Sequence, residues 1–169
     1  SNWDTSNVTT MRAMFSQCAS LPYLDVSNWD VRNVQSTAKM FYNCLALHDL
    51  VGLGNWQTSS LTECNSMFSS GSSNTGDMPF DTQDLAVGNW DMSDVTNAGY
   101  MFYGCGSLEE IDLSNWDTSN METFHHFFCD CYNLKKVNFS GWDTSKVTTY
   151  DAMFNHCISL EVLDLSSFD

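Results

Sequence analysis

The sequence predicts a repeat solenoid, in which about six short coils stack along one axis. Three observations predict it. A tryptophan recurs at nearly constant spacing, other apolar landmarks keep register with it, and one unit of this size cannot bury its own apolar side. The tryptophans are Trp3, Trp29, Trp56, Trp90, Trp116 and Trp142, and Phe168 continues the series. Successive steps are 26, 27, 34, 26, 26 and 26 residues, so each step marks one coil.

The charge and composition of the chain exclude several functions. Twenty-one acidic residues against six basic ones give a formal net charge of −15. Nucleic acids and anionic membranes bind cationic surfaces, so neither is an expected partner. The sequence holds no apolar run of about 18 residues, so membrane insertion is not expected either. A hydrophobic content of 43% in 169 residues is instead enough for one domain with a buried core.

Each repeat divides into a strand, a turn and a compact third segment. In "LEEIDLSNW", Ile111 and Leu113 alternate with polar residues, as in a half-buried strand. The following "DTSN" supplies an aspartate and hydroxyl side chains suited to tight turns. In "MRAMFSQCASL", Met11, Met14 and Phe15 follow the i, i+3, i+4 spacing of one helix face. This spacing predicts a short α- or 3₁₀-helix over residues 11–21.

The repeat phrase resembles a known family. The pattern L-x-x-L-x-L-x-x-W resembles the strand segment of leucine-rich repeats. The longer phrase "SNWDTSNVTTM", followed by Met-Phe and Cys, resembles the 26-residue repeat of BspA-like bacterial surface proteins. The resemblance implies a right-handed, leucine-rich-repeat-like stack of strands and 3₁₀ segments. It also implies a cell-surface, secreted or virion-exposed location, a link to adhesion, and no catalytic residues.

Two features of the chain depart from strict repetition. A Gly/Ser/Asp/Pro-rich stretch over residues 69–84 lengthens one repeat and predicts a surface loop inserted into a single domain spanning 1–169. The chain also begins and ends inside repeat phrases. We therefore expect it to be a segment of a longer repeat protein.

The tryptophans and cysteines each allow two interpretations. Stacked tryptophans fill the core of each coil, or they form an exposed platform for a glycan; their position at the strand end favours the core. The cysteines at one repeat position either form a column of reduced, apolar thiols or form disulfides with their neighbours in adjacent coils. Gly71 occupies this position in one repeat, which favours the reduced column. The members of this column are Cys18, Cys44, Cys105, Cys131 and Cys157. Cys129 and Cys131 with His125, His126 and His156 lack a zinc-site spacing.

Two columns of acidic residues accompany the repeats. The first follows the tryptophan and comprises Asp4, Asp30, Asp91, Asp117 and Asp143. These aspartates either cap the turn of each coil or share Ca²⁺ between coils, and capping is favoured. The second column lies between inward-facing strand residues and so faces outward. This column and the serines beside it are the candidate partner-binding residues. They are Asp25, Asp112, Asn138 and Asp164 in the column, with the serines Ser27, Ser114 and Ser140.

The insertion supplies further candidates. Long loops in regular arrays are often functional, although insertions are also simply tolerated. Asp77, Phe80 and Asp81 are therefore added to the partner-binding candidates. Asp77, Asp81 and Asp84 are the candidate ligands should the loop bind Ca²⁺. No other cofactor is expected.

These patterns favour a binding function over catalysis. No phosphate-binding glycine loop, G-x-S-x-G or H-E-x-x-H motif occurs in the sequence. We therefore expect a non-enzymatic recognition or adhesion module that binds a protein or glycan through its strand face or its insertion. The alternative is a structural spacer, or a subunit of an extracellular filament or virion that binds adjacent copies of itself.

Overall fold

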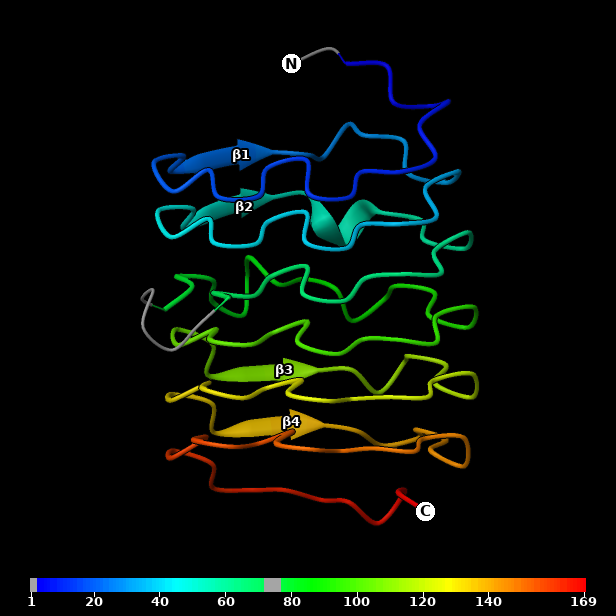
Figure 1. The fold of residues 1–169 in the computed structure, drawn as a ribbon, viewed down its shortest axis with the longest axis vertical. Coiled ribbons are helices and arrows are strands. Elements are labelled where there is room, and N and C mark those ends of the chain that lie inside the picture. The colour runs from blue at the N-terminus through cyan, green and yellow to red at the C-terminus, as the bar shows by residue number, and fades with distance from the viewer. Residues whose placement is uncertain (1–2, 72–76) are drawn as a thin grey trace.

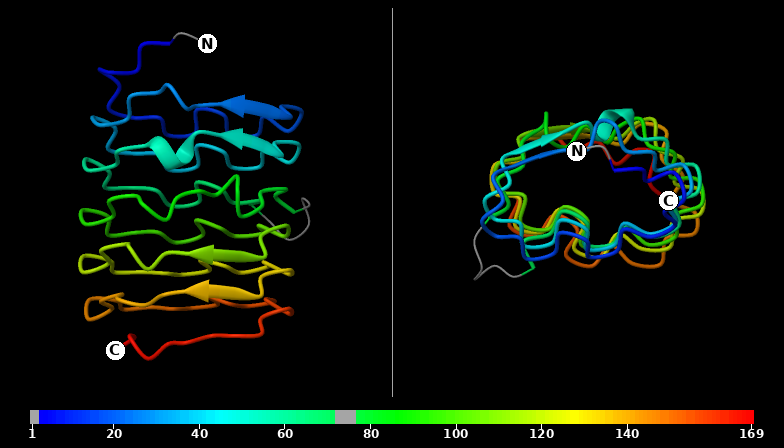
Figure 2. Two further views of the ribbon diagram at one scale, coloured as in Figure 1. Left: turned by 180° about the vertical axis from the view of Figure 1, so that it is seen from behind. Right: turned by 90° about the horizontal axis from the view of Figure 1, so that it is seen from above.

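The chain forms a stack of coils. The computed structural model describes residues 3–71 and 77–169. Successive coils lie one above another along the long axis, with the two termini at opposite ends (Figure 1). Viewed from above, the coils superpose on one flattened ring (Figure 2). Residues one repeat apart are therefore neighbours in space.

Short parallel strands line one long side of the ring. Within 3–71 and 77–169, β1 (Tyr23–Asp25) pairs with β2 (Asp49–Val51), and β3 (Glu110–Asp112) pairs with β4 (Lys136–Asn138). The one helical element there is a 3₁₀ turn, η1 (Leu53–Asn55), after β2. Ile111 lies opposite Val137, and both are buried, while the strand residues flanking them face outward. Alternating polarity thus sets which strand side chains are available to a partner.

A second ladder of parallel bridges joins the residues that lie seven positions after each tryptophan in the sequence. It joins Thr10 to Ser36, Ser36 to Glu63, Glu63 to Asn97, Asn97 to Thr123, and Thr123 to Thr149. The bridge from Glu63 to Asn97 spans the lengthened repeat, so the insertion leaves this ladder in register.

The helix predicted over residues 11–21 is wrong. These residues form successive turns, with Ala13 and Gln17 in the left-handed region at φ of 54° and 64°. The N–H of Met14 closes a local turn onto Met11, whereas the N–H of Phe15 bonds the next coil at Met40. Because one turn uses about four residues, it produces nearly the same apolar spacing as a helix face. Other coils repeat these left-handed positions at Lys39, Asn43, Ser66, Tyr100, Gly104, His126, Asp130, Ala152 and His156.

A column of phenylalanines runs through the core. Neighbouring rings stack with centroids 5.2–6.1 Å apart and interplanar angles of 5–15°. The column comprises Phe15, Phe41, Phe68, Phe102, Phe128 and Phe154. Aromatic stacking at this spacing adds to the burial of the rings and joins each coil to the next.

Five of the six tryptophans are buried, with 1–7% of their surface exposed, while Trp3 is 53% exposed. The alternative of an exposed aromatic platform is therefore wrong for these five. Four indole N–H groups donate to a carbonyl of the preceding coil over 2.9–3.3 Å. The pairs are Trp56–Val26, Trp90–Leu53, Trp116–Val87 and Trp142–Leu113. Each acceptor lies three residues before the tryptophan of the preceding coil. These hydrogen bonds therefore hold adjacent coils in a fixed register.

The cysteine column has a similar arrangement. All seven cysteines are free thiols. The Sγ atoms of Cys44, Cys131 and Cys157 each lie 3.0–3.1 Å from the carbonyl oxygen of the column phenylalanine in the preceding coil, which is Phe15, Phe102 and Phe128 respectively. Burial raises the pKa of Cys44 to about 11 and the pKa of Cys157 to about 12. These thiols therefore act as compact apolar groups with a weak donor.

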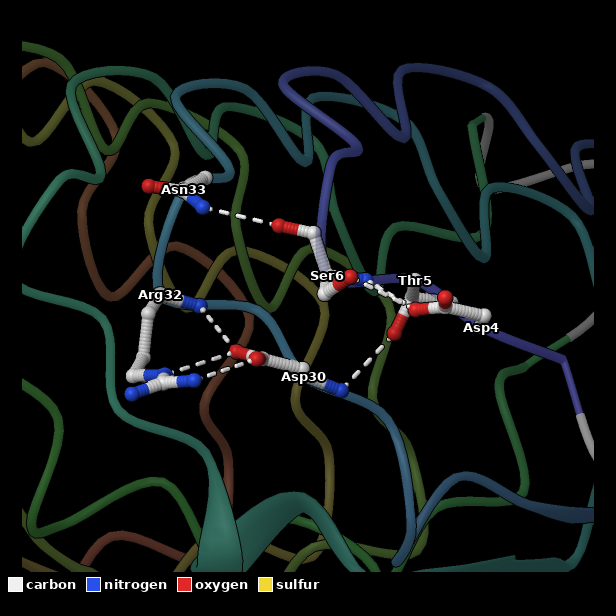
Figure 3. A network of polar contacts seen from close by, with 6 residues as sticks. All are labelled: Asp4, Thr5, Ser6, Asp30, Arg32 and Asn33. Carbon is white, nitrogen blue, oxygen red and sulfur yellow. Dashed lines mark hydrogen bonds and ion pairs between the residues drawn. The ribbon is translucent and has the colours of Figure 1, made fainter.

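The aspartates that follow the tryptophans cap the turns. Asp4 Oδ1 accepts the backbone N–H of Ser6 at 3.0 Å, and Asp30 accepts the N–H and guanidinium of Arg32 (Figure 3). The Thr5 hydroxyl oxygen accepts the N–H of Asp30 at 2.7 Å, which ties this turn to the next coil. Asp91, Asp117 and Asp143 likewise accept the N–H of the serine two residues later.

The insertion packs back onto the core at both described ends. The N–H of Ser70 bonds Tyr103 at 2.9 Å, and the N–H of Met78 bonds Gly104 at 2.7 Å. Met78 is fully buried, and so is Phe80, which contacts Phe68 edge to face at 5.6 Å. Residues 72–76 of the predicted 69–84 loop lie outside the described residues. The prediction that Phe80 binds a partner is wrong, because its ring is buried in the core against Phe68.

Candidate functional site

The outward column on the strand side is built from short capping motifs. Asp25, Asp112 and Asp164 each accept the backbone N–H of the serine two residues later, at 2.9–3.0 Å. Asn138 does the same for Ser140 at 3.1 Å through its amide oxygen. Capping fixes the backbone after each strand and holds these polar groups at equivalent places on successive coils. Ser27 and Ser114 are half-buried beneath this column.

Two adjacent hollows lie on this surface around β3 and β4. The first has a volume of about 220 Å³ and is lined by Thr82, Glu110, Ile111, Asp112, Lys136 and Asn138. The second, of about 310 Å³, is lined by Lys136, Asn138, Ser140, Val162, Asp164 and Ser166, among others. The structure thus groups four candidates, Asp112, Asn138, Ser140 and Asp164. We call this surface the β3–β4 face.

Asp25 and Ser27 lie outside this group. Asp25 is the last residue of β1 and Ser27 lies two residues after it, and β1 belongs to a separate strand pair nearer the amino terminus. Figure 1 shows β1 and β2 in the upper part of the stack and β3 and β4 in the lower part. The candidate residues therefore divide into two places along the same side of the molecule.

The β3–β4 face carries charges of both signs. Hydrogen bonds from the backbone N–H and hydroxyl of Ser114 lower the pKa of Asp112, with a further contribution from Lys136. Hydrogen bonds from Ser166 likewise lower the pKa of Asp164. Both carboxylates are therefore ionised at neutral pH. Beside them, Lys135 pairs with Glu109 at 2.7 Å on the exposed surface.

Lys136 and Thr82 of this face were not among the sequence candidates. Lys136 lines both hollows, and Thr82 lines the first, where its hydroxyl donates to the Glu110 carbonyl at 2.6 Å. Lys136 precedes the inward Val137, so strand alternation could have identified it. Thr82 could not be identified in this way, because the sequence does not show that the insertion returns to the edge of β3.

The insertion carboxylates do not form the calcium site considered above. Asp84 is 8% exposed, and its two oxygens accept the N–H groups of Leu50 at 2.9 Å and Asp81 at 3.1 Å. Asp81 Oδ1 in turn accepts the N–H groups of Gln83 and Asp84. Asp77 is exposed and lies beside Gly106. Among the described residues, the three carboxylates do not converge as a group of metal ligands, because two of them cap local backbone.

The in-register coils define a tandem-repeat protein. The chain belongs to the family described as "Mycoplasma protein of unknown function, DUF285", whose model matches residues 1–80 and again residues 77–169. This family is related to the BspA-like repeat surface proteins. No curated protein and no solved structure matches the chain. Within the described residues, no helix has the length and apolar character needed to cross a bilayer.

Proposed function

We propose that the chain is a leucine-rich-repeat-like solenoid that acts as a non-enzymatic recognition or adhesion module on an extracellular, cell or particle surface. The observation that carries this proposal is the pair of adjoining hollows on the β3–β4 face. They bring carboxylate, amide, hydroxyl and ammonium groups together along a rigid sheet. The relation of the family to surface proteins supports the location.

The chemistry of the face defines the kind of ligand. Carboxylates and an amide accept hydrogen bonds, and Lys136 donates them. A glycan presents hydroxyl groups that can do both, and a protein loop presents backbone and basic side chains. The two hollows adjoin across β3, β4 and the following coil, which suits an extended ligand lying across several coils.

Substitutions on the β3–β4 face test the proposal. Binding of the purified chain is measured on arrays of glycans and of extracellular matrix proteins. We expect Lys136→Glu and Asp164→Lys to weaken binding by about tenfold or more, the loss that corresponds to about 1.4 kcal/mol. Glu122→Lys is the matched control, because it changes an exposed charge outside the strand side. Unchanged binding by both face variants would contradict this site.

One alternative is a self-assembling subunit or spacer. An apolar hollow of about 390 Å³ at the last coils is lined by Tyr150, Met153, Phe154, Leu165 and Phe168. At the opposite end, Trp3 is half-exposed. A head-to-tail contact between copies would cover both surfaces and extend the stack. Sedimentation and small-angle scattering at increasing concentration should then show elongating particles, and a constant monomer would exclude this alternative.

A further inference from the structure

Three potential metal ligands lie close together beside the second ladder of bridges, next to the pair Thr123–Thr149. The ligand atoms of His125, His126 and Asp151 all lie within 4.8 Å of one another. Among the described residues, this is the only such group of histidine, cysteine and acidic side chains. His125 Nδ1 lies 3.2 Å from Asp151 Oδ2. Ligands about 2.1 Å from one zinc ion are separated by a similar distance, so this pair already has the required spacing.

The backbone explains why adjacent histidines face the same way. Neighbouring residues in an extended strand point to opposite faces. His126 instead has a φ of 54°, in the left-handed region, and the two imidazole centroids lie 4.1 Å apart. The N–H of His126 also bonds the carbonyl of Asp151 at 2.8 Å, which holds the next coil against this turn. The coil geometry thus presents all three side chains together.

Two of the imidazole nitrogens have contrasting surroundings. Nδ1 of His126 is buried and has no hydrogen-bond partner within the described part of the chain. A buried imidazole nitrogen without a partner carries a desolvation cost, which would be removed if this nitrogen ligated the metal ion. Nε2 of His125 instead lies 2.9 Å from the hydroxyl oxygen of Tyr100. A ligating histidine commonly bonds an outer group in this way, which fixes its tautomer and ring orientation.

The site is accessible to an ion from solvent. The side chains of His125 and Asp151 are 33% and 67% exposed. A hollow of about 320 Å³ opens beside Tyr100, His125 and Thr149. Gly99, which occupies the His125 position in the preceding coil, lines the same hollow. Of the three ligands, His125 lines this hollow, and the exposed side chain of Asp151 leaves the group open to a fourth ligand from solvent.

We propose that His125, His126 and Asp151 bind a divalent transition metal ion, Zn²⁺, with a fourth position open to water or to a partner's side chain. Two imidazoles and one carboxylate are suitable zinc ligands and form a common ligand set. Because Asp151 comes from the next coil, the ion joins two coils. This site is separate from the β3–β4 face and does not depend on the recognition function proposed above.

Zinc titration of the metal-free chain by calorimetry tests the site. We expect one zinc ion per chain. His126→Ala and Asp151→Asn should each weaken binding by at least tenfold, and Tyr100→Phe by about tenfold, as expected for loss of an outer hydrogen bond. His48→Ala is the matched control and should bind like the wild type, because exposed His48 pairs with Asp49 and is not part of the His125–His126–Asp151 group.

Cobalt substitution distinguishes this site from zinc binding by the thiols. The visible spectrum of the Co²⁺-loaded chain should show nitrogen and oxygen ligation, without an intense thiolate charge-transfer band. Asp151→Asn changes an exposed side chain, so its circular dichroism should remain that of the wild type. The proposal is overturned if the wild type binds no zinc, if the ligand variants bind it unchanged, or if the cobalt spectrum shows thiolate ligation.

Discussion

At the scale of single residues, Trp116 shows how one side chain joins adjacent coils. Its indole is 2% exposed, lies parallel to Trp142 at 6.2 Å, and donates its N–H to the Val87 carbonyl at 3.0 Å. Replacement by alanine would leave a cavity and an unpaired carbonyl. We predict that Trp116→Ala lowers the free energy of unfolding by about 3–5 kcal/mol, measured by urea denaturation. Trp3→Ala, at the half-exposed end position, should cost much less. Equal losses would contradict a core role specific to the buried tryptophans.

Asp84 stabilises the described end of the insertion through backbone hydrogen bonds. Leu50, whose N–H it accepts, is 2% exposed, so removing the acceptor leaves a buried donor unpaired. We predict that Asp84→Ala costs about 1–3 kcal/mol of stability by chemical denaturation. Asp84→Asn keeps one acceptor oxygen and should retain more stability than the alanine variant. An alanine variant as stable as the wild type would show that the bond contributes nothing.

At the scale of elements, the cysteine column gives a test of packing. Burial raises the pKa values of Cys44, Cys64 and Cys157 to about 11, 12 and 12, so few of these thiols ionise near pH 8. Cys18 is exposed. Because the thiolate is the reactive form, we predict fast labelling of Cys18 by a thiol reagent in the folded chain and labelling of all seven cysteines only after denaturation. Cys18→Ser should abolish the fast phase. Fast labelling of several cysteines would contradict the buried column.

The capping aspartates predict how stability changes with pH. The side chain of Arg32 lowers the pKa of Asp30 from 3.8 to about 2, and serine hydrogen bonds lower the pKa values of Asp143 and Asp164. Because the folded-state values lie below the unfolded ones, this stabilisation is present above about pH 4 and is lost as the pH falls toward 2. Asp84 has the opposite sign, since burial raises its pKa and its protonation favours the folded state. The more numerous capping groups should dominate.

Thermal unfolding followed by circular dichroism checks this prediction. The melting temperature should be nearly constant between about pH 7 and 4 and should fall below pH 4. Replacing Asp143 with Asn preserves an acceptor, as Asn138 does in the neighbouring column. This variant should lose less stability than the wild type between pH 4 and 2. A melting temperature that rises continuously to pH 2 would contradict the capping account.

At the scale of the whole molecule, the charge of −15 predicts a dependence on salt. The acidic columns recur on successive coils, so their mutual repulsion opposes stacking. Raising the ionic strength from about 0.01 M to 0.15 M shortens the screening length from about 30 Å to 8 Å. We predict that the melting temperature rises over this range. An equal osmolarity of uncharged glycerol does not screen charge and serves as the control. A fall on adding salt would show that exposed ion pairs, such as Arg12–Glu63, outweigh the repulsion.

The sequence predicts features that repeat better than features that occur once. Tryptophan spacing indicates which residues are equivalent, and the bridges pair residues at corresponding positions such as Thr123 and Thr149. The helix over 11–21 was predicted wrongly because stacked four-residue turns share its spacing. Phe80 and Thr82 could not be placed, since they depend on the path by which the insertion returns. The His125–Asp151 contact was also missed, because it combines one-off residues from two coils.

The two anchors of the insertion have a practical consequence for protein engineering. Ser70 and Met78 bond the adjacent carbonyls of Tyr103 and Gly104, so the chain leaves and rejoins the stack at neighbouring points. Closing a longer flexible loop between fixed ends costs only about 0.6 kcal/mol for each doubling of its length. A foreign peptide grafted between Ser70 and Met78 should therefore be displayed without a shift in coil register. The same positions would allow natural variants to diversify in sequence and length while the rest of the scaffold is preserved.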